Sequence, residues 1–371
     1  MSSKIRILYT IPNFDTAGSG QVLLGIAKNL DPSIFEVHIC CNHDRGEYFK
    51  KVVESGIKVH IGEFTAPLAP KLNLIPRVLK VARFFKKINP DIVHSFHWSS
   101  DFTEALAAKL AGAKWIYTKK NMSWGNKSWK IRSSLANGIV TINPFMKELY
   151  FPKKKQVKLV PCSVDQNRFK PGKRNDLIRE ELGFKSGDKL IICIAAVLEV
   201  KGIDKLIEAF EQLPDSNYKL ILLGDKSSEY AEELILKVQD KQLDDRIKFL
   251  GKKSNVEDYL LASDLFVLPT RNIKRSEALG VALLEAMASG ILAIGSDIYG
   301  IKFILQDFPE LLYDPEDPKE LATKIQDVLD LPEEKKSAIK TKFSKIIEER
   351  FSVEKEVQDH ESFYKGILGK I

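Results

Sequence analysis

The sequence lacks the long apolar segments that mark a membrane protein. No uncharged apolar run in its 371 residues approaches the about 18 residues that a membrane-spanning helix needs. Residues 1–15 also lack the cleavage region of a secretory signal peptide. These two absences lead us to expect a cytoplasmic protein.

Cysteine is scarce, and its spacing excludes the usual zinc and disulfide patterns. The four cysteines, Cys40, Cys41, Cys162 and Cys193, form no C-x-x-C motif and have no partnering histidine spacing. At least three of them fall within apolar, strand-like runs, which favours buried free thiols. We therefore expect no zinc site, and because nothing else in the sequence requires a metal, we predict a site without a metal and an activity that needs no cofactor.

The chain has no helix of the nucleic-acid-binding kind, in which basic and aromatic residues alternate. Its net charge of +7 is modest for this length, so an anionic small molecule or membrane surface is a better partner than nucleic acid. Residues 68–90 stand out because they contain six Lys or Arg and no acidic residue. The basic stretch 71–87 is either an amphipathic helix that contacts anionic lipid at the inner face of the cell membrane, or a solvated helix face.

A dinucleotide fingerprint is also absent. Gly18-Ser19-Gly20 follows the first strand, but Leu23 stands where the third glycine should be, and the loop after Tyr9 is too long for that motif's tight turn. The segment is therefore a phosphate or sugar loop, or an ordinary connection between strand and helix.

What the sequence does contain is a twofold alternation of short apolar strands and amphipathic helices. Its length exceeds what one hydrophobic core supports, and a turn-rich linker at 161–172 separates the two series. We predict an α/β protein with two Rossmann-like, doubly wound domains, 1–168 and 169–352, and a last helix, 353–371, that packs back on the first. Ligands bind at the carboxyl ends of such strands, so two halves that face each other would form a cleft.

The stretch from Glu277 to Gly290 is the most informative one. Glu285 lies on a segment that is otherwise apolar all round, where an unpaired carboxylate is costly. Gly280 should open this helix and Gly290 should end it, and a helix start with small residues is an anion site. Glu285 either pairs with a Lys or Arg of a neighbouring element, or accepts hydroxyl groups of a sugar nucleotide.

Four other residues, at or after strand ends, suggest chemistry. Lys201 is expected at a helix start, which is unfavourable without a bound anion. His94 and His97 end another strand and are either a proton shuttle or structural histidines. Trp124 lies in a cluster of tryptophan and cations that suits an acceptor with sugar rings and phosphate, or that is simple loop packing.

Taken together, these motifs resemble the retaining glycosyltransferases of family 4, which have the GT-B fold. The strongest element is the E-x7-E signature from Glu277 to Glu285. The supporting motifs are Gly18–Gly20, Pro90–His94, Val164–Phe169, Lys201–Gly202, Leu223–Asp225, Phe249–Gly251 and Asp314–Pro318.

The resemblance implies roles for particular residues. Glu277 would contact the donor sugar and act in catalysis with Lys201, which would bind the diphosphate, while Glu285 would contact the ribose. The other donor-side residues would be Gly18, Ser19, Gly20, Leu250, Leu279, Gly280 and Val281, and the acceptor-side residues would be His97, Lys120 and Trp124.

Two positions depart from the family pattern. Ala196 replaces an arginine that usually precedes the lysine, and Arg271, Lys274 or Arg275 could supply the missing charge. Lys120 occupies a position that often holds histidine, which puts a histidine role in catalysis in doubt.

The function that the resemblance implies is retaining transfer of a hexose or N-acetylhexosamine from a nucleotide diphosphate sugar. UDP-sugar is favoured and GDP-mannose is second, and the acceptor would be a glycan or a lipid-linked sugar in cell-surface polysaccharide synthesis. The alternatives are another GT-B enzyme, such as a nucleotide-sugar epimerase or a sugar phosphorylase, or an inactive protein that binds sugar nucleotides.

Overall fold

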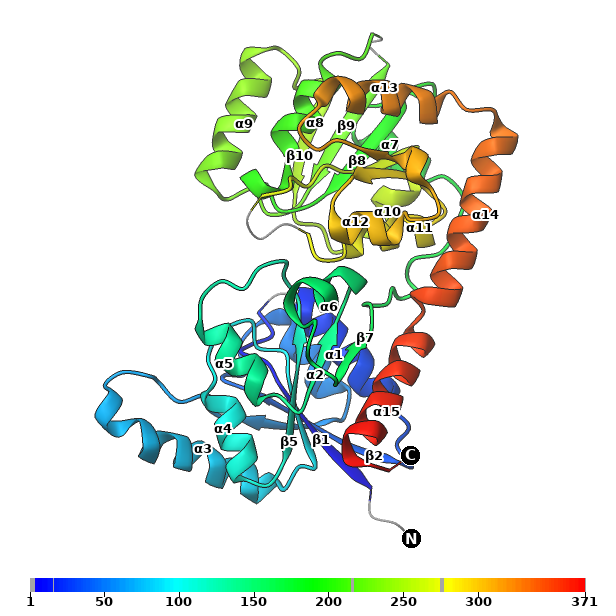
Figure 1. Ribbon diagram of the computed structural model, residues 1–371. Coiled ribbons are helices and arrows are strands. Elements are labelled where there is room, and N and C mark those ends of the chain that lie inside the picture. The colour runs from blue at the N-terminus through cyan, green and yellow to red at the C-terminus, as the bar shows by residue number, and fades with distance from the viewer. Residues whose placement is uncertain (1–3, 16, 215–216, 274–276, 371) are drawn as a thin grey trace. The chain divides into compact units, whose positions relative to one another are not determined.

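The computed structural model describes residues 4–15, 17–214, 217–273 and 277–370, which form two compact units (Figure 1). The first unit comprises Met1–Cys162 and Val353–Ile371, and the second comprises Ser163–Ser352. The turn-rich residues 163–168, which the sequence analysis assigned to the first domain, therefore group with the second.

Within the described residues, the first unit contains a sheet of seven parallel strands in the order β3-β2-β1-β4-β5-β6-β7. Ile7 of β1 lies opposite Val37 of β2 on one side and Ile92 of β4 on the other. The strands are β1 (Ile5–Thr10), β2 (Phe35–Cys41), β3 (Lys58–Ile61), β4 (Ile92–Ser95), β5 (Lys114–Lys119), β6 (Gly138–Thr141) and β7 (Val157–Leu159).

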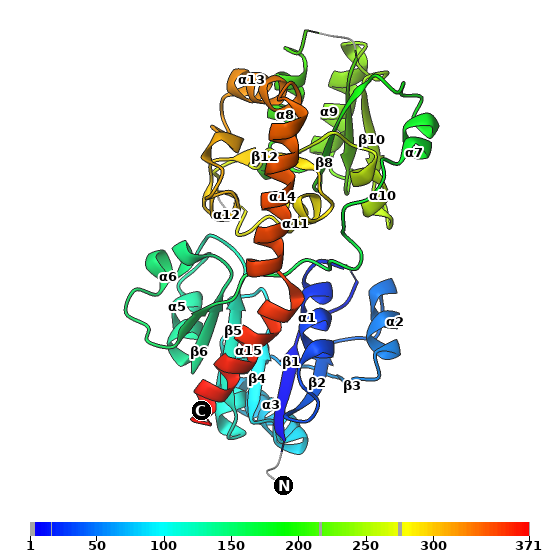
Figure 2. The ribbon, with the colours of Figure 1, turned by 90° about the vertical axis from the view of Figure 1, so that its right-hand side faces the viewer.

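Helices cover both faces of this sheet, as the period of two in β1 requires. Ile7 and Tyr9 point into a core shared with α1 and α15, whereas Leu8 points into a core shared with α3 and α4. Figure 2 shows α15 lying across these strands beside α1. The helices of the unit are α1 (Ala17–Asn29), α2 (Glu47–Glu54), α3 (Leu74–Ile88), α4 (Thr103–Leu110), α5 (Ser128–Leu135), α6 (Pro144–Tyr150) and α15 (Val353–Leu368), with a 3₁₀ turn, η1 (Lys71–Asn73), before α3.

The second unit repeats this plan with a six-stranded parallel sheet in its described part, in the order β10-β9-β8-β11-β12-β13. Its strands are β8 (Lys189–Ile194), β9 (Tyr218–Leu223), β10 (Ile247–Gly251), β11 (Leu265–Leu268), β12 (Leu292–Ser296) and β13 (Leu312–Tyr313). Its helices are α7 (Asp176–Glu181), α8 (Ile203–Phe210), α9 (Glu229–Asp240), α10 (Val256–Leu261), α11 (Val281–Ala288), α12 (Tyr299–Ile304), α13 (Pro318–Leu329) and α14 (Glu333–Arg350), with 3₁₀ turns η2 (Glu199–Lys201) and η3 (Pro309–Leu311).

Both sheets are wound in two directions from a central strand, which confirms the predicted doubly wound α/β fold. The chain runs outward from β1 through β2 to β3, then returns to the other side of β1 at β4. The second sheet does the same from β8, with β9 and β10 on one side and β11 on the other. Among the residues that the structure describes, no helix has the length and apolar character to cross a membrane.

Candidate active site

The reversal of strand order in the second sheet brings together the two residues that the sequence predicts to be catalytic. Lys201 follows β8 and Glu277 follows β11, and these two strands are neighbours at the point where the winding changes direction. The carboxyl ends of such strands diverge and leave room for a ligand. The loops after β8 and β11 are therefore the expected place for a donor site.

Lys201 and Glu277 contact each other directly. The Lys201 ammonium donates to Glu277 Oε2 at 2.6 Å, and both side chains remain partly exposed. Two features hold the loops together: the Arg271 amide donates to the Val200 carbonyl at 2.9 Å, and Gly202 lies against the Pro269 carbonyl. Gly202 has φ +64°, and a Cβ there would collide with that carbonyl oxygen, so this turn requires glycine.

The start of α11 is arranged as an anion site. Gly280 precedes the helix with φ +92°, and no side chain of the described residues caps the helix. Its carbonyl accepts from the amides of Leu283 and Leu284, at 3.0 and 3.4 Å. Within the described ranges, the amides of Val281 and Ala282 have no acceptor, so they can donate to a phosphate.

Glu285 lies one turn into the same helix and is half-buried. Burial raises the pKa of its carboxyl to about 7; nearby Arg168 opposes this rise and Glu257 adds to it. Arg168 is itself paired with Glu257 at 2.7 Å. In the part of the chain described here, Glu285 forms no ion pair, so its pairing with a neighbouring Lys or Arg is not the arrangement observed.

Arg271, one of the proposed replacements for the charge missing at Ala196, is occupied by carboxylates. Its guanidinium lies 2.8 Å from Asp204 and within 3.7 Å of Glu199 and Glu316. This geometry gives no support to a role for Arg271 in holding diphosphate. Leu250 lies half-buried in β10. The other two candidate cations, Lys274 and Arg275, lie outside the described residues.

In the first unit, the glycine segment is helical and does not form a loop. Gly18, Ser19 and Gly20 belong to the first turn of α1, which begins at Ala17. Gly20 packs under Phe14, where a Cβ would come within 2.8 Å of the ring, whereas Gly18 faces open space. The segment follows β1 at the point where the first sheet reverses its winding, which is compatible with a ligand but does not demonstrate one.

His94 of β4 and His97, which follows that strand, have different environments. His94 is fully buried, with Nδ1 2.8 Å from the Tyr364 hydroxyl and Nε2 2.9 Å from Thr118 Oγ1. Both ring nitrogens are therefore used, and His94 is a structural histidine. His97 lies after the strand, half-buried, and burial together with Arg132 lowers its pKa to about 4. His97 is therefore neutral near pH 7.

The two other acceptor-side residues follow β5. The Lys120 ammonium lies 4.1 Å from the centre of the Phe96 ring. It has no hydrogen-bond acceptor among the described residues, and burial lowers its pKa to about 7. Trp124 is half-buried in the loop that leads to α5. These two residues share a loop with each other, and His97 follows the adjacent strand β4.

Sequence reasoning missed a buried polar network beside His97. The Glu104 carboxylate is fully buried and accepts from Thr10 and from Ser95, the latter at 2.7 Å. Arg132, also fully buried, lies 3.6 Å from Glu104 and donates to the carbonyl of His97 at 3.3 Å. The only signal in the sequence was the position of Arg132 within a cluster of tryptophan and cations.

The described residues contain no group of three His, Cys, Asp or Glu side chains placed to hold a metal ion. A metal-free site stays a prediction. The second unit places a cation, Lys201, beside the carboxylate of Glu277. Helix α11, which follows Glu277 in the chain, adds the free amides of its first turn and the carboxyl of Glu285.

Two doubly wound α/β domains are typical of the GT-B class of folds. The second domain here also carries the Lys201–Glu277 pair at the ends of its strands. Solved structures of that class are similar to this chain. One is the crystal structure of Alr3699/HepE from Anabaena in complex with UDP, which is 20% identical and has a TM-score of 0.82. The likeness covers 98% of this chain and 100% of that one, and it confirms the predicted GT-B fold.

Comparison with known families identifies the chain more closely. Residues 16–168 match the family described as Glycosyltransferase Family 4, and residues 174–345 match the one described as Glycosyl transferases group 1. The chain belongs to the family 4 glycosyltransferases. The predicted family and the predicted enzyme class are thereby confirmed.

Individual relatives have diverse substrates in their names. N-acetyl-alpha-D-glucosaminyl L-malate synthase of Bacillus anthracis is 35% identical over 130 residues, which are 35% of this chain and 32% of that protein. N,N'-diacetylbacillosaminyl-diphospho-undecaprenol alpha-1,3-N-acetylgalactosaminyltransferase of Campylobacter jejuni is 24% identical over 82% of this chain and 85% of that protein. The chain spans only 32–40% of the length of four of its curated relatives.

Proposed function

We propose that this chain is a retaining glycosyltransferase that moves a hexose or N-acetylhexosamine from a nucleotide diphosphate sugar to a glycan or lipid-linked acceptor in cell-surface polysaccharide synthesis. The observation that carries this proposal is the contact of Lys201 with Glu277 next to the uncapped start of α11. A cation and free amides suit a diphosphate, and a carboxylate beside them suits the hydroxyl groups of the attached sugar.

The mechanism is mainly electrostatic. As the bond between the sugar and the diphosphate breaks, negative charge grows on the leaving phosphate, and Lys201 with the amides of Val281 and Ala282 stabilises it. Glu277 holds the sugar by its hydroxyls. The acceptor hydroxyl attacks from the side of the leaving group, and a donor phosphate oxygen takes its proton, so that no enzyme nucleophile is required.

The ion pair between Lys201 and Glu277 also orders the side chains that the donor would meet. Each residue holds the other in the loops after β8 and β11, so little side-chain freedom remains to be lost when the donor binds. The donor then replaces one contact with two, because the lysine turns to phosphate and the glutamate turns to sugar hydroxyls.

The donor and acceptor are inferred from relatives. We favour a UDP-sugar because the similar Anabaena protein was solved with UDP, and we place GDP-mannose second. A lipid-linked acceptor is suggested by the Campylobacter jejuni relative, whose name includes a diphospho-undecaprenol. We assign donor binding to the second unit and acceptor binding, through His97, Lys120 and Trp124, to the first.

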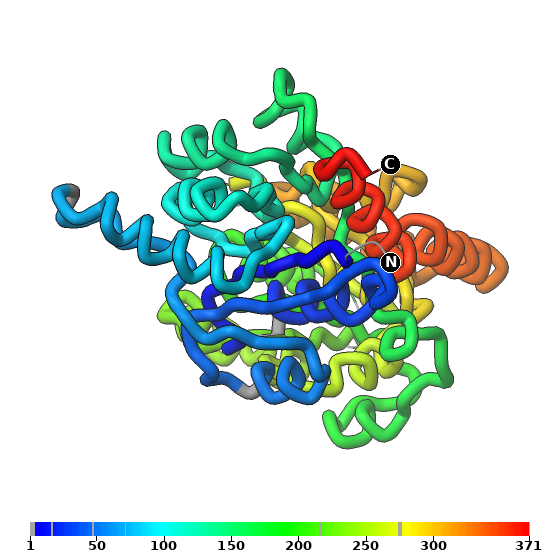
Figure 3. Tube along the Cα trace, turned by 90° about the horizontal axis from the view of Figure 1, so that it is seen from below, coloured from blue at the N-terminus to red at the C-terminus, as the bar shows by residue number. Residues whose placement is uncertain are grey.

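The protein is proposed to work in the cytoplasm, in peripheral contact with an anionic membrane through residues 71–87. Figure 3 shows α3 extending from the rest of the first unit. Leu72 of η1 is 95% exposed and Ile75 of α3 is 73% exposed, and α3 also carries the cations Lys80, Arg83, Lys86 and Lys87. Exposed apolar side chains beside cations match a surface that inserts among anionic headgroups.

Vesicle sedimentation tests this contact. We expect the parent protein to sediment with anionic vesicles and not with neutral ones. Changing Lys80, Arg83, Lys86 and Lys87 together to Glu should leave it in the supernatant. A variant that sediments as the parent does would remove the membrane from the proposal.

A transfer assay with radiolabelled UDP- and GDP-sugars and a glycan acceptor tests the proposed reaction. We expect labelled sugar to pass to the acceptor with the anomeric configuration retained, and Glu277→Gln to abolish this. Product that forms from donor without acceptor would indicate an epimerase, and product that requires free phosphate would indicate a phosphorylase. Turnover by Glu277→Gln equal to that of the parent would refute the assignment.

A further inference from the structure

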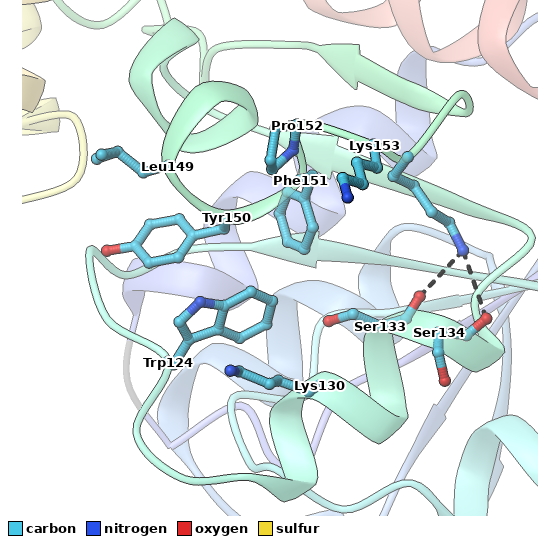
Figure 4. Close-up of a pocket in the computed structure, with 10 residues that line it drawn as sticks. Trp124, Lys130, Ser133, Ser134, Leu149, Tyr150, Phe151, Pro152 and Lys153 are labelled. Atoms are coloured by element: carbon cyan, nitrogen blue, oxygen red, sulfur yellow. Dashed lines mark hydrogen bonds between the residues drawn. The ribbon is translucent and has the colours of Figure 1, made fainter.

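A pocket of about 520 Å³ lies in the first unit, between the ends of α5 and α6 (Figure 4). Trp124, Tyr150 and Phe151 form its aromatic wall, and Lys130 and Lys153 lie on either side of that wall. Its volume is within the range of about 300–1,000 Å³ that is usual for small-molecule sites. Apart from Trp124, none of these residues belongs to the site described above.

Contacts within the protein itself hold the aromatic wall in place. The ring centre of Trp124 lies 5.3 Å from that of Tyr150 and 5.5 Å from that of Phe151, and both pairs are edge-to-face. Behind the wall, the buried ammonium of Lys119 lies 4.4 Å from the centre of the Tyr150 ring. It also donates to the Ser123 carbonyl at 2.6 Å, which fixes the residue before Trp124. A preformed wall of this kind loses little entropy on binding.

The charged residues that line the pocket, Lys130, Lys153 and Lys154, are all positive. Lys154 is committed to the fold, since its ammonium donates to the carbonyls of Ser133 and Ala136, at 3.0 and 2.6 Å, at the end of α5. Lys130 and Lys153 are exposed and form no ion pair among the described residues. Two cations are therefore available to an anionic group.

We propose that this pocket binds a saccharide that carries an anionic substituent, either a phosphate or a carboxylate. The C–H face of a sugar ring packs on the aromatic wall, and the anionic group meets Lys130 or Lys153, whichever lies on its side of the wall. An inorganic anion would leave the aromatic wall in water, and a neutral sugar would leave both ammonium groups without a partner. The inference rests on the proposed function, because it makes this pocket a subsite for the acceptor glycan.

Calorimetric titration of the whole chain tests the inference with four probes: glucose 1-phosphate, glucuronic acid, methyl glucoside and inorganic phosphate. We expect at least one of the two anionic sugars to bind more tightly than both methyl glucoside and inorganic phosphate. The stronger of the two identifies the anionic substituent. Equal binding of inorganic phosphate would reduce the pocket to an anion patch and overturn the proposal, as would a failure of both anionic sugars to bind.

Charge-reversal variants locate the binding. Lys130→Glu combined with Lys153→Glu should weaken the preferred anionic sugar at least tenfold. The matched control, Lys127→Glu with Lys155→Glu, changes two exposed lysines outside the pocket and should leave affinity unchanged. Equal losses in both double variants would contradict the proposal. Trp124→Leu, with an unchanged charge, should also weaken binding, and an unchanged affinity there would show that no sugar ring contacts the wall.

Lys201→Ala separates this pocket from the donor site. The variant should keep its affinity for the anionic sugar, because Lys201 belongs to the second unit. If the probe binds as expected but no donor supports transfer, the proposed reaction fails and the saccharide pocket stands. If transfer occurs and the probes do not bind, the pocket fails alone.

Discussion

The two units share the same winding, but His94 in the first and the Lys201–Glu277 pair in the second differ in how far their hydrogen-bonding capacity is filled. In the first, His94 is enclosed, and both of its ring nitrogens have partners. In the second, the half-buried Glu285 makes no ion pair within the described residues, and the one ion pair described there for Lys201 and Glu277 joins them to each other. A group whose hydrogen-bonding capacity is filled stabilises the fold, whereas one with spare capacity can bind a ligand.

Removal of the Lys201 ammonium tests this difference between the two units most strongly. Lys201→Ala should lower the rate of sugar transfer by about 10²–10³-fold, the usual cost of losing one group that stabilises developing negative charge. Unfolding by urea should change little, because the Lys201–Glu277 pair is partly exposed. Steady-state kinetics with the preferred donor provide the measurement.

The matched control for this variant is Lys205→Ala on α8, where the lysine pairs with Glu208. It should retain the parent rate. An equal loss in both variants would mean that general electrostatics, and not the position of Lys201, supports transfer.

The converse experiment breaks the network of the first unit. The Tyr364 hydroxyl lies 2.8 Å from both the Tyr9 hydroxyl and His94 Nδ1, and all three groups are fully buried. Tyr364→Phe leaves these two partners unsatisfied and should lower the free energy of unfolding by about 1–3 kcal/mol. Donor affinity should stay at the parent value. A variant with normal stability and weakened donor binding would reverse the assignment of roles.

A pH series sharpens the role of Glu285, whose pKa burial raises to about 7. Ribose hydroxyls donate to the carboxylate form, so donor affinity should be nearly constant above pH 8 and fall by about tenfold between pH 8 and pH 6. Glu285→Gln should bind more weakly at pH 8 but show a much flatter profile. Calorimetric titration at several pH values measures the donor affinity of the parent and of Glu285→Gln.

The stability of the unliganded protein should change in the opposite direction. Because the folded-state pKa of Glu285 lies above its ordinary value of 4.5, the protonated form is favoured by folding. Its contribution therefore becomes more favourable as pH falls from about 7 towards 4.5. At pH 8, Glu285→Gln should be at least as stable as the parent in urea. A clear loss of stability there would indicate that the carboxylate has a structural partner.

Much of this contrast could be predicted from the sequence, because it depends on local signals. Apolar runs predicted the strands, Gly280 and Gly290 marked the ends of α11, and strand ends predicted the positions of Lys201 and Glu277. The winding follows from the alternation of strands and helices. Family motifs then gave the fold and the enzyme class.

The remainder depends on contacts between residues that are distant in sequence. Lys201 meets Glu277 across 76 positions, and Tyr364 meets His94 across 270. The ion pair between Arg271 and Asp204 could not be predicted either, because any of several carboxylates could have paired with this arginine. We predicted a loop at Gly18–Gly20 because glycine is unfavourable within helices. Helix α1 nevertheless begins before this segment, at Ala17, and Gly20 packs against the Phe14 ring.

The central claim is that Glu277 holds the donor sugar while Lys201 and α11 hold its diphosphate. The most direct test is a calorimetric comparison of a nucleotide diphosphate sugar with its free nucleoside diphosphate, on the parent and on Glu277→Gln. The donor is chosen as the UDP-, GDP- or ADP-sugar that raises the melting temperature most. Our account predicts that Glu277→Gln weakens the sugar nucleotide severalfold and leaves the free diphosphate bound at least as tightly. Equal weakening of both ligands, or of neither, would contradict it.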